Sequence, residues 1–291
     1  MAGQFIKKTR RWRKIPQDKF LLAEAFLRER EKFCVAACAR FLGIRESRGH
    51  VWYLSDENEK VNALLLHSRR TLLPVFRGKR RIPHPRFLRR FLGVVPIHAV
   101  QGLREDTELL EPLMIEQGYH ASQLIDYDLM SLDSSPDGLL PVQDLKPELP
   151  GLILRIPQPE DEDSLFALQS AYEQEEVLPK NSTFNPAACR LNLRQILSRE
   201  YMLVAELDGE LVGKINTSAE SFTLRQVGGV YVRPDYRRLG IGSKMALVFA
   251  RNLLTQSKGL TLFVKKRNIA ACKVYRKIGY NFLADYRIIY Y

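Results

Sequence analysis

Two glycines, Gly240 and Gly242, lie in a short turn between a valine-rich strand pattern and an amphipathic helix pattern. Residues without a Cβ let backbone amides converge on a bound oxyanion at such a turn. The helix behind the turn adds amides without intrahelical partners and the positive end of its dipole, which favour a phosphate or pyrophosphate. Ala246, Phe249 and Leu253 recur at helical spacing, so we expect this helix to bury one face and hold the turn rigidly against a sheet.

The turn does not match the common nucleotide-binding loops. A third glycine and an acidic residue about twenty positions on, which mark a dinucleotide-binding fold, are missing, and no Gly-Lys-Ser/Thr follows as in a Walker loop. A glycine turn alone also serves as a plain strand-to-helix connection. What the turn binds therefore has to be inferred from the surrounding residues.

Those residues carry a family resemblance. The run Val230-Tyr231-Val232-Arg233-Pro234-Asp235-Tyr236-Arg237-Arg238-Leu239-Gly240-Ile241-Gly242 resembles the V-x-V-x-P-x-x-R-x-x-G-x-G segment of the GNAT superfamily of N-acetyltransferases. A later set resembles that family's next strand, Asn, Tyr and Gly-aromatic motif, and comprises Leu262-Phe263-Val264, Asn268, Ala271, Tyr275, Gly279 and Tyr280. Both motifs occur in the family's order.

The resemblance covers residues 152–291 and implies a mixed α/β (α+β) fold, with a twisted, splayed mixed sheet flanked by helices. It implies acetyl-CoA as co-substrate and no metal. The pantetheine arm would pair with the backbone of Val230 and Val232, as an added strand does, and amides of residues 238–243 would hold the pyrophosphate. The expected cofactor-binding residues are Val230, Tyr231, Val232, Arg237, Arg238, Leu239, Gly240, Ile241, Gly242, Ser243, Asn268 and Tyr275.

Acyl transfer to an amine needs a neutral amine, a stabilised oxyanion and a proton for the departing thiolate. Tyr275 lies seven residues after Asn268, close to two helical turns, so both side chains project from one helix face. By itself Tyr275 is better interpreted as a packing residue, but with the resemblance we expect it to be the general acid. Asn268 also suits a helix N-cap. A main-chain amide near Val232 would serve the oxyanion.

The sequence indicates no general base. The chain has no His after His120, and the strand position that often supplies an acid in this family falls near Gln226 and Gly228. The available carboxylates are Glu173, Glu175, Glu176, Glu206, Glu220 and the terminal carboxylate of Tyr291. A water relay, or an acceptor amine of lowered pKa, would need none of them.

The length of 291 residues suits two domains. Turn-forming residues gather between Leu132 and Gly151, so we expect one domain over 1–140 and another over 151–291. The order helix, hairpin, helix, strand in residues 20–130 is similar to a degenerate GNAT-like domain without the cofactor loop, as in bacterial two-part GNAT proteins. Such a domain would shape the acceptor site or an interface.

Periodicity and turn signals predict the individual elements. We expect helices over 20–42, 105–117, 160–171, 242–254 and 268–278, and strands over 51–54, 63–66, 125–130, 152–156, 201–206, 210–216, 223–232, 260–264 and 282–290.

The net charge of +12 is unevenly distributed. Residues 61–104 contain no Asp or Glu but ten basic residues: Arg69, Arg70, Arg77, Lys79, Arg80, Arg81, Arg86, Arg89, Arg90 and Arg104. This block suits a solvated surface or contact with nucleic acid or another anion. The segment lacks the spacing of a nucleic-acid-binding motif, so specific recognition has no positive signal.

The four cysteines lack the spacing of a zinc site or a disulfide framework. Cys34 and Cys38 would share a helical face, where buried packing is favoured over a metal half-site. No apolar run approaches the roughly 20 residues that span a bilayer, and no signal-peptide pattern follows the basic residues 1–16. We therefore expect a cytoplasmic protein without a membrane partner.

These observations together predict an N-acetyltransferase that moves an acetyl group from acetyl-CoA directly to an amine of a small molecule or peptide. Two alternatives stay open. One is a non-catalytic acyl-CoA-binding regulatory module, suggested by the missing base. The other is an acetyltransferase brought to RNA or the ribosome by its basic first half. The sequence indicates neither the acceptor nor an oligomeric state.

Overall fold

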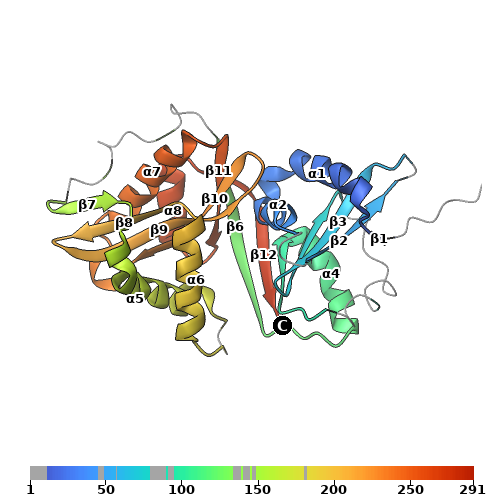
Figure 1. Ribbon diagram of the computed structural model, residues 1–291, viewed down its shortest axis with the longest axis horizontal. Coiled ribbons are helices and arrows are strands. Elements are labelled where there is room, and N and C mark those ends of the chain that lie inside the picture. Colours follow the sequence, from blue (N-terminus) through green and yellow to red (C-terminus); the bar gives the residue numbers. More distant parts are fainter. Residues whose placement is uncertain are drawn as a thin grey trace, which may run out of the picture. The chain divides into compact units, whose positions relative to one another are not determined.

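The structure is a computed structural model that describes residues 12–44, 49–56, 58–78, 90, 95–133, 139, 145, 149–179 and 182–291. The chain divides into two compact units (Figure 1). The first unit comprises Met1–Asp126 and Asp285–Tyr291, and the second comprises Tyr127–Ala284. This division differs from the sequence-based boundary, because residues 127–133 belong to the second unit and the last residues of the chain belong to the first.

The first unit is a mixed sheet with helices. Its helices are α1 (Phe20–Glu29), α2 (Val35–Leu42) and α4 (Arg104–Glu116). Its strands, in sheet order, are β1 (Arg13–Lys14), β2 (His50–Ser55), β3 (Val61–Ser68), β4 (Thr71–Phe76), β5 (Ala99–Leu103) and the end of β12 (Asn281–Tyr290). Neighbouring strands run antiparallel, except the parallel pair β4 and β5.

Hydrophobic periodicity explains the helices of this unit. α1 buries Ala23, Phe26 and Leu27, which are three and four residues apart and share one face. α2 buries Cys38 and Phe41 in the same way. Every residue of β3 is buried, as expected for a strand covered on both faces.

All four cysteines are free and buried. The Sγ atoms of Cys34 and Cys38 lie 3.7 Å apart, which confirms that the two residues share a face. Buried packing is therefore the role that the structure gives them.

The second unit is also a mixed sheet between helices. Its helices are α5 (Glu162–Tyr172), continued by the π-helical turn η6 (Glu173–Val177), then α6 (Pro186–Arg199), α7 (Ile241–Leu254) and α8 (Ile269–Ile278). Its strands, in sheet order, are the later part of β6 (Gln123–Asp133), then β11 (Gly259–Lys265), β10 (Leu224–Val232), β9 (Glu210–Glu220), β8 (Met202–Leu207) and β7 (Leu152–Arg155). Among the described strand pairs of this unit, β10 and β11 alone are parallel.

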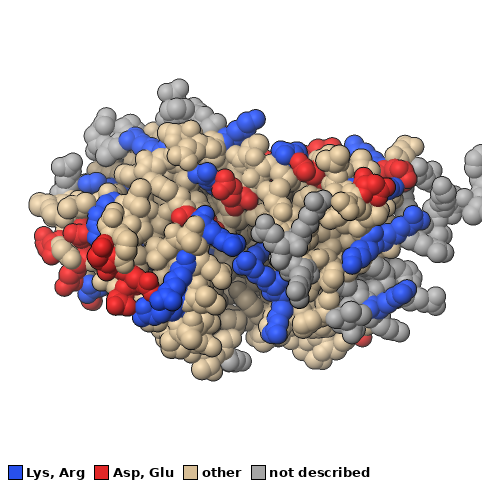
Figure 2. Space-filling model, in the orientation of Figure 1, with Lys and Arg blue, Asp and Glu red and all other residues tan. Residues whose placement is uncertain are grey.

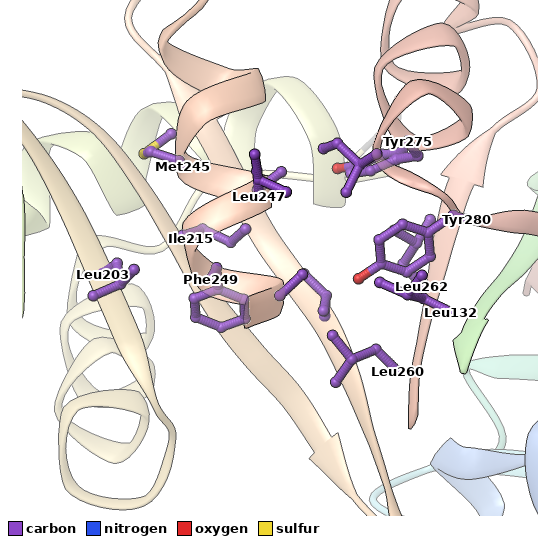
Figure 3. Packing of buried hydrophobic residues seen from close by; sticks show 14 of the residues in the cluster. Leu132, Leu203, Ile215, Met245, Leu247, Phe249, Leu260, Leu262, Tyr275 and Tyr280 are labelled. Carbon is purple, nitrogen blue, oxygen red and sulfur yellow. The ribbon is translucent and has the colours of Figure 1, made fainter. Parts of the chain in front are cut away.

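Alternating residues of this sheet bury against opposite helix layers. On β8, Leu203 and Ala205 belong to the main core with α7 and α8, whereas Met202 and Val204 pack with α5 and α6. Figure 3 shows the main core, in which the Phe249 ring of α7 lies among buried leucine and isoleucine side chains. The sheet is thus covered on both faces, and the position of α7 is fixed.

The acidic start of α5 is anchored by arginines. Arg155 of β7 binds both carboxylate oxygens of Asp161, at 2.6 and 2.9 Å. The guanidinium of Arg190 on α6 pairs with Glu162 and lies 4.1 Å from the centre of the Phe166 ring. These contacts join α5 to the neighbouring strand and helix.

The two halves of the chain repeat one order of elements: two helices, three strands, a further strand, a helix and a last strand. The repeat is α1, α2, β2, β3, β4, β5, α4, β6 in the first half and α5, α6, β8, β9, β10, β11, α8, β12 in the second, with α7 between β10 and β11. The parallel pair falls at the same place in both. The last strand of each half completes the other unit's sheet, because β6 pairs with β11 and β12 pairs with β5.

All predicted helices and strands occur near their expected positions. The strands β1, β4 and β5 and the helix α6 were not predicted from the sequence. The turn-forming stretch used to place the domain junction, Ser134 to Gly138, lies outside the described residues.

Candidate functional site

The strands β10 and β11 separate in the middle of the second unit's sheet. They pair over residues 224–227 of β10 and 259–262 of β11. Both strands continue to Val232 and Lys265, and the structure, which describes all of these residues, gives no further pairing between them. The edge of β10 beyond Val227 can therefore hydrogen-bond an extended, amide-bearing ligand.

A β-bulge lies at the point of separation. Gly228 pairs with Asn216 and Tyr231 with Lys214, so Gly229 and Val230 together oppose one residue of β9. Gly229 has a φ of 57°, and a Cβ there would lie 1.8 Å from the side-chain oxygen of Asn216. Only glycine fits this position without a rearrangement.

The predicted phosphate loop connects β10 to α7. Arg238 and Gly240 have positive φ values of 68° and 88°, and Gly240 is the N-cap of α7 without a capping side chain. The first turn of α7 carries no acidic residue. A Cβ on Gly242 would meet only Val232, at an ordinary 3.7 Å, so packing alone does not require glycine there. These features fit a bound phosphate.

The side chain of Arg237 points away from this role. Its Nη2 lies 2.7 Å from Oε2 of Glu175 on η6, and its Nε donates to the carbonyl oxygen of Val232 at 2.9 Å. The guanidinium also lies over the ring of Tyr231, and it lowers the pKa of Glu175. The loop therefore has its backbone amides, rather than this side chain, as phosphate ligands.

The two predicted residues of α8 lie at its start and in its buried face. The side chain of Asn268 accepts a hydrogen bond from the amide of Ala271 at 3.1 Å, which confirms it as an N-cap. Tyr275 is buried and packs edge-on against Tyr280 (Figure 3). Burial raises the pKa of Tyr275 above the ordinary value, so its hydroxyl stays protonated at neutral pH.

Each of the five glutamates weighed as a base has a polar neighbour. The contacts are Glu173 with Gln169 and Asn192, Glu175 with Arg237, Glu176 with Lys265, Glu206 with Arg155, and Glu220 with Arg225. Tyr291 lies in the first unit, where its ring packs edge-on against Tyr119.

The strand position expected to hold an acid is occupied by a buried amide. Gln226 donates to the hydroxyl of Ser218 at 2.9 Å and is paired in register with Thr261 of β11. Its Oε1 and the Thr261 hydroxyl have no hydrogen-bond partner among the described residues. Neither group can accept a proton from an amine at neutral pH.

Lys214 is a site residue that the sequence analysis missed. Its side chain is fully buried on β9, and its Nζ donates to the carbonyl oxygen of Gly229 at 2.9 Å and to Oδ1 of Asn216 at 3.3 Å. The ring centre of Tyr172 lies 4.5 Å from Nζ. Burial lowers the pKa of Lys214 to about 7, although the charge of Glu173 opposes the shift.

The basic block of the first unit is only partly described. Lys79, Arg80, Arg81, Arg86 and Arg89 lie outside the described residues. Of the others, Arg77 pairs with Glu29 and Arg104 with Glu108. On the face drawn in Figure 2, acidic side chains lie among many of the basic ones.

The described residues contain no group of three or more His, Cys, Asp or Glu side chains arranged to hold a metal ion. None of their helices has both the length and the apolar character needed to cross a membrane.

Residues 163–280 match a family model described as "Acetyltransferase (GNAT) family". This range contains the bulge, the loop before α7 and both α8 residues. A comparison with curated proteins gave no match.

The fold is similar to solved structures over nearly the whole chain. A Drosophila protein has a TM-score of 0.67 at 14% identity and covers 97% of this chain and 99% of its own. A tandem GNAT protein from the clavulanic acid biosynthesis pathway has a TM-score of 0.60 at 13% identity, covering 96% and 97%. A GCN5-related N-acetyltransferase from Sphaerobacter thermophilus has a TM-score of 0.56 at 18% identity, covering 96% and 94%. The predicted fold class, with a second domain of the same type, is confirmed.

Proposed function

Since residues 163–280 belong to the GNAT family of acetyltransferases, we propose that this protein transfers an acetyl group from acetyl-CoA directly to an amine. The observation that carries the proposal is the open edge of β10 beyond Val227, followed at once by a glycine-capped helix start. The first feature suits the amides of a pantetheine arm and the second suits a pyrophosphate.

The residues present fit such a cofactor. Backbone groups of Val230 and Val232 would bind the pantetheine arm. Amides of residues 238–243 would bind the pyrophosphate, because the helix start lacks both a capping side chain and an acidic residue. The Oδ1 of Asn268 accepts the capping hydrogen bond from the Ala271 amide, so the side-chain nitrogen of Asn268 is the group that would contact the pantetheine arm. When bound, acetyl-CoA supplies an activated acetyl thioester.

The chain itself would supply two catalytic functions. A backbone amide at the bulge would stabilise negative charge on the thioester oxygen, as preorganised donors do in acyl transfer. The protonated hydroxyl of Tyr275 would give a proton to the departing thiolate. Burial raises the pKa of Tyr275, so the hydroxyl is protonated at neutral pH although it is a weaker acid than an exposed tyrosine.

Direct transfer is favoured over an acetyl-cysteine intermediate. Cys272 lies on the same helix as Tyr275, but it is buried, and burial raises the pKa of its thiol. A thiol is a poor nucleophile compared with its thiolate. We therefore propose that the acceptor amine attacks the thioester while both substrates are bound.

The acceptor in this proposal is an amine of a small molecule or peptide, and the reaction takes place in the cytoplasm. The first unit would shape the acceptor site or an interface. The acceptor class has to come from experiment, because loops that select acceptors in one fold follow no general code.

The test is thiol release from acetyl-CoA, screened against amino acids, polyamines, aminoglycosides and peptides with free N-termini. Steady release with an acceptor, and its loss when the acceptor amine is blocked, would support the proposal. Calorimetric titration with acetyl-CoA measures cofactor binding separately. Tight binding without turnover on any amine would instead indicate a regulatory acyl-CoA-binding module.

A further inference from the structure

A buried lysine, Lys214, lies directly beside the bulge and is not one of the groups that carry the proposed acetyl transfer. The Nζ of Lys214 has three neighbours: the carbonyl oxygen of Gly229, the side-chain oxygen of Asn216 and the ring of Tyr172. An ammonium group has three N–H donors. Two oxygens and an aromatic face match that number, because a ring face attracts a cation.

The hydrogen bond from Lys214 holds one particular peptide group. The carbonyl of Gly229 and the N–H of Val230 belong to the same planar trans peptide, so they point in opposite directions. When the carbonyl is bound to Lys214 of β9, the N–H of Val230 is directed away from Lys214. β9 flanks β10 on one edge, and β11 has separated from the other.

We propose that Lys214 is a positioning residue that orients and polarises the Gly229–Val230 peptide, so that the Val230 amide stabilises the charge developing on the thioester oxygen. This inference rests on the proposed acetyl transfer. A hydrogen bond from a cation to a carbonyl polarises the peptide and makes its N–H a stronger donor. Lys214 thereby acts on the reacting atoms through one peptide group.

The groups around Lys214 set its charge. Glu173 of η6 favours the ammonium form, and Cys189 of α6 is the other titratable group that influences it. Tyr172 of α5 supplies a ring face to the Lys214 ammonium group, and Tyr231 of β10 lies opposite Lys214 in the strand register. Because burial opposes the charge, Lys214 titrates near pH 7, and its ammonium form predominates below that pH.

A general-base role for Lys214 predicts the opposite pH dependence. A base would need the neutral amine, which gains population above pH 7, and a lone pair directed at the acceptor. The three directions around Nζ already face two oxygens and a ring. The positioning role needs the ammonium form, so the contribution of Lys214 should decline as pH rises through 7.

The first experiment compares the wild type with Lys214→Met, which keeps a side chain of similar length and removes its charge. We expect kcat to fall about 10-fold to 100-fold, somewhat less than for loss of an oxyanion donor itself, with the acetyl-CoA Kd changed less than threefold. The ratio of wild-type to variant kcat should decrease from pH 6 to pH 8.5. A ratio that increases over this range would assign Lys214 as the base, and a constant ratio would leave it a purely structural role. Either result overturns the proposal.

The main measurement of the second experiment is made on the wild-type protein and needs no turnover. In the wild-type protein, the NMR signal of the Val230 amide should shift with pH with a midpoint near 7. Asp106→Asn is a matched control, because Asp106 is a buried group of the first unit whose pKa is raised to about 7 and which accepts from the Phe76 amide. That variant should abolish a titration at Phe76 and leave the one at Val230. An unchanging Val230 signal overturns the positioning role, whereas loss of all thiol release with the titration intact would contradict the proposed reaction alone.

Discussion

The guanidinium of Arg237 lies 2.7 Å from the carboxylate of Glu175, which joins the loop after β10 to the turn η6. The next residue of η6 contacts the other separated strand, since Glu176 lies 2.7 Å from the buried Nζ of Lys265 on β11. One short helical turn is therefore tied to the loop after β10 and to the end of β11, beyond the point where the two strands separate. This connection explains why Arg237, although it stands in the phosphate loop, is not directed at α7.

The first prediction concerns this ion pair. Arg237→Met should change the acetyl-CoA Kd less than threefold, because the guanidinium is engaged by Glu175 and by the Val232 carbonyl. Glu175→Gln should have an equally small effect. Both side chains are about two-fifths exposed, so the pair should contribute no more than about 1 kcal/mol to stability. Calorimetry and thermal unfolding check this, and a tenfold loss of affinity in Arg237→Met alone would show that its side chain binds phosphate.

The second prediction concerns the start of α7. Gly240→Asp should raise the acetyl-CoA Kd at least about 100-fold, because a carboxylate would occupy the position of the pyrophosphate at the positive end of the helix. Gly78→Asp is the matched control. Gly78 has a similar φ of 82° and nothing within 4 Å of an added Cβ, in the first unit. Equal affinities of the two variants would place the cofactor elsewhere.

The third prediction concerns Tyr275. Tyr275→Phe removes the hydroxyl but keeps the ring that packs against Tyr280. Turnover should fall about 100-fold, the usual size of a general-acid contribution, while acetyl-CoA affinity and the unfolding temperature stay nearly unchanged. Steady-state kinetics with calorimetry measure both effects. Unchanged turnover would remove Tyr275 from the acid role.

The fourth prediction concerns pH and the stability of the first unit. Burial raises the pKa of Asp106 to about 7, while the Phe76 amide and the charge of Arg30 oppose the shift. The folded protein thus holds this proton more tightly than the unfolded chain, whose carboxyl titrates near 4. The stabilisation that comes from this bound proton is fully present below pH 4 and is lost as pH rises to 7.

Asp106→Asn removes this dependence, because an amide does not titrate and can still accept from Phe76. From pH 4 to pH 7 the unfolding free energy of the wild type should fall relative to that of the variant. The expected fall is about 1.4 kcal/mol for each unit by which the pKa of Asp106 is raised. Chemical denaturation at several pH values measures it. A difference that stays constant with pH would show that Asp106 keeps an ordinary pKa.

Local sequence patterns were enough to predict most of the helices and strands. The helix of residues 241–254 and the hairpin around Asp208 and Gly209 carry strong signals, since apolar spacing and a turn dipeptide act over a few residues. β4 was missed because Pro74 interrupts an otherwise apolar run. The exchange of β6 and β12 between the sheets was beyond local patterns, because it depends on pairing between residues far apart in sequence.

The residues of the candidate site, too, could be predicted only in part from the sequence. Asn268 was predicted as a cap, and the structure confirms it. Lys214 was missed, although a lone lysine in the run Leu211-Val212-Gly213-Lys214-Ile215 is a usable signal for a buried charge. Its partner is the Gly229 carbonyl, and a backbone oxygen at a bulge has no signature in the sequence.

The exchanged strands have a consequence for biosynthesis. Residues 127–133 leave the ribosome long before β11, the strand with which they pair, and β5 has to wait for residues 286–290 until the whole second unit has been translated. The first unit therefore cannot complete its sheet before the second unit has been translated. A fragment that stops before β12 leaves an open edge on β5, and a fragment that begins after β6 leaves one on β11, so either half expressed alone should be prone to aggregation.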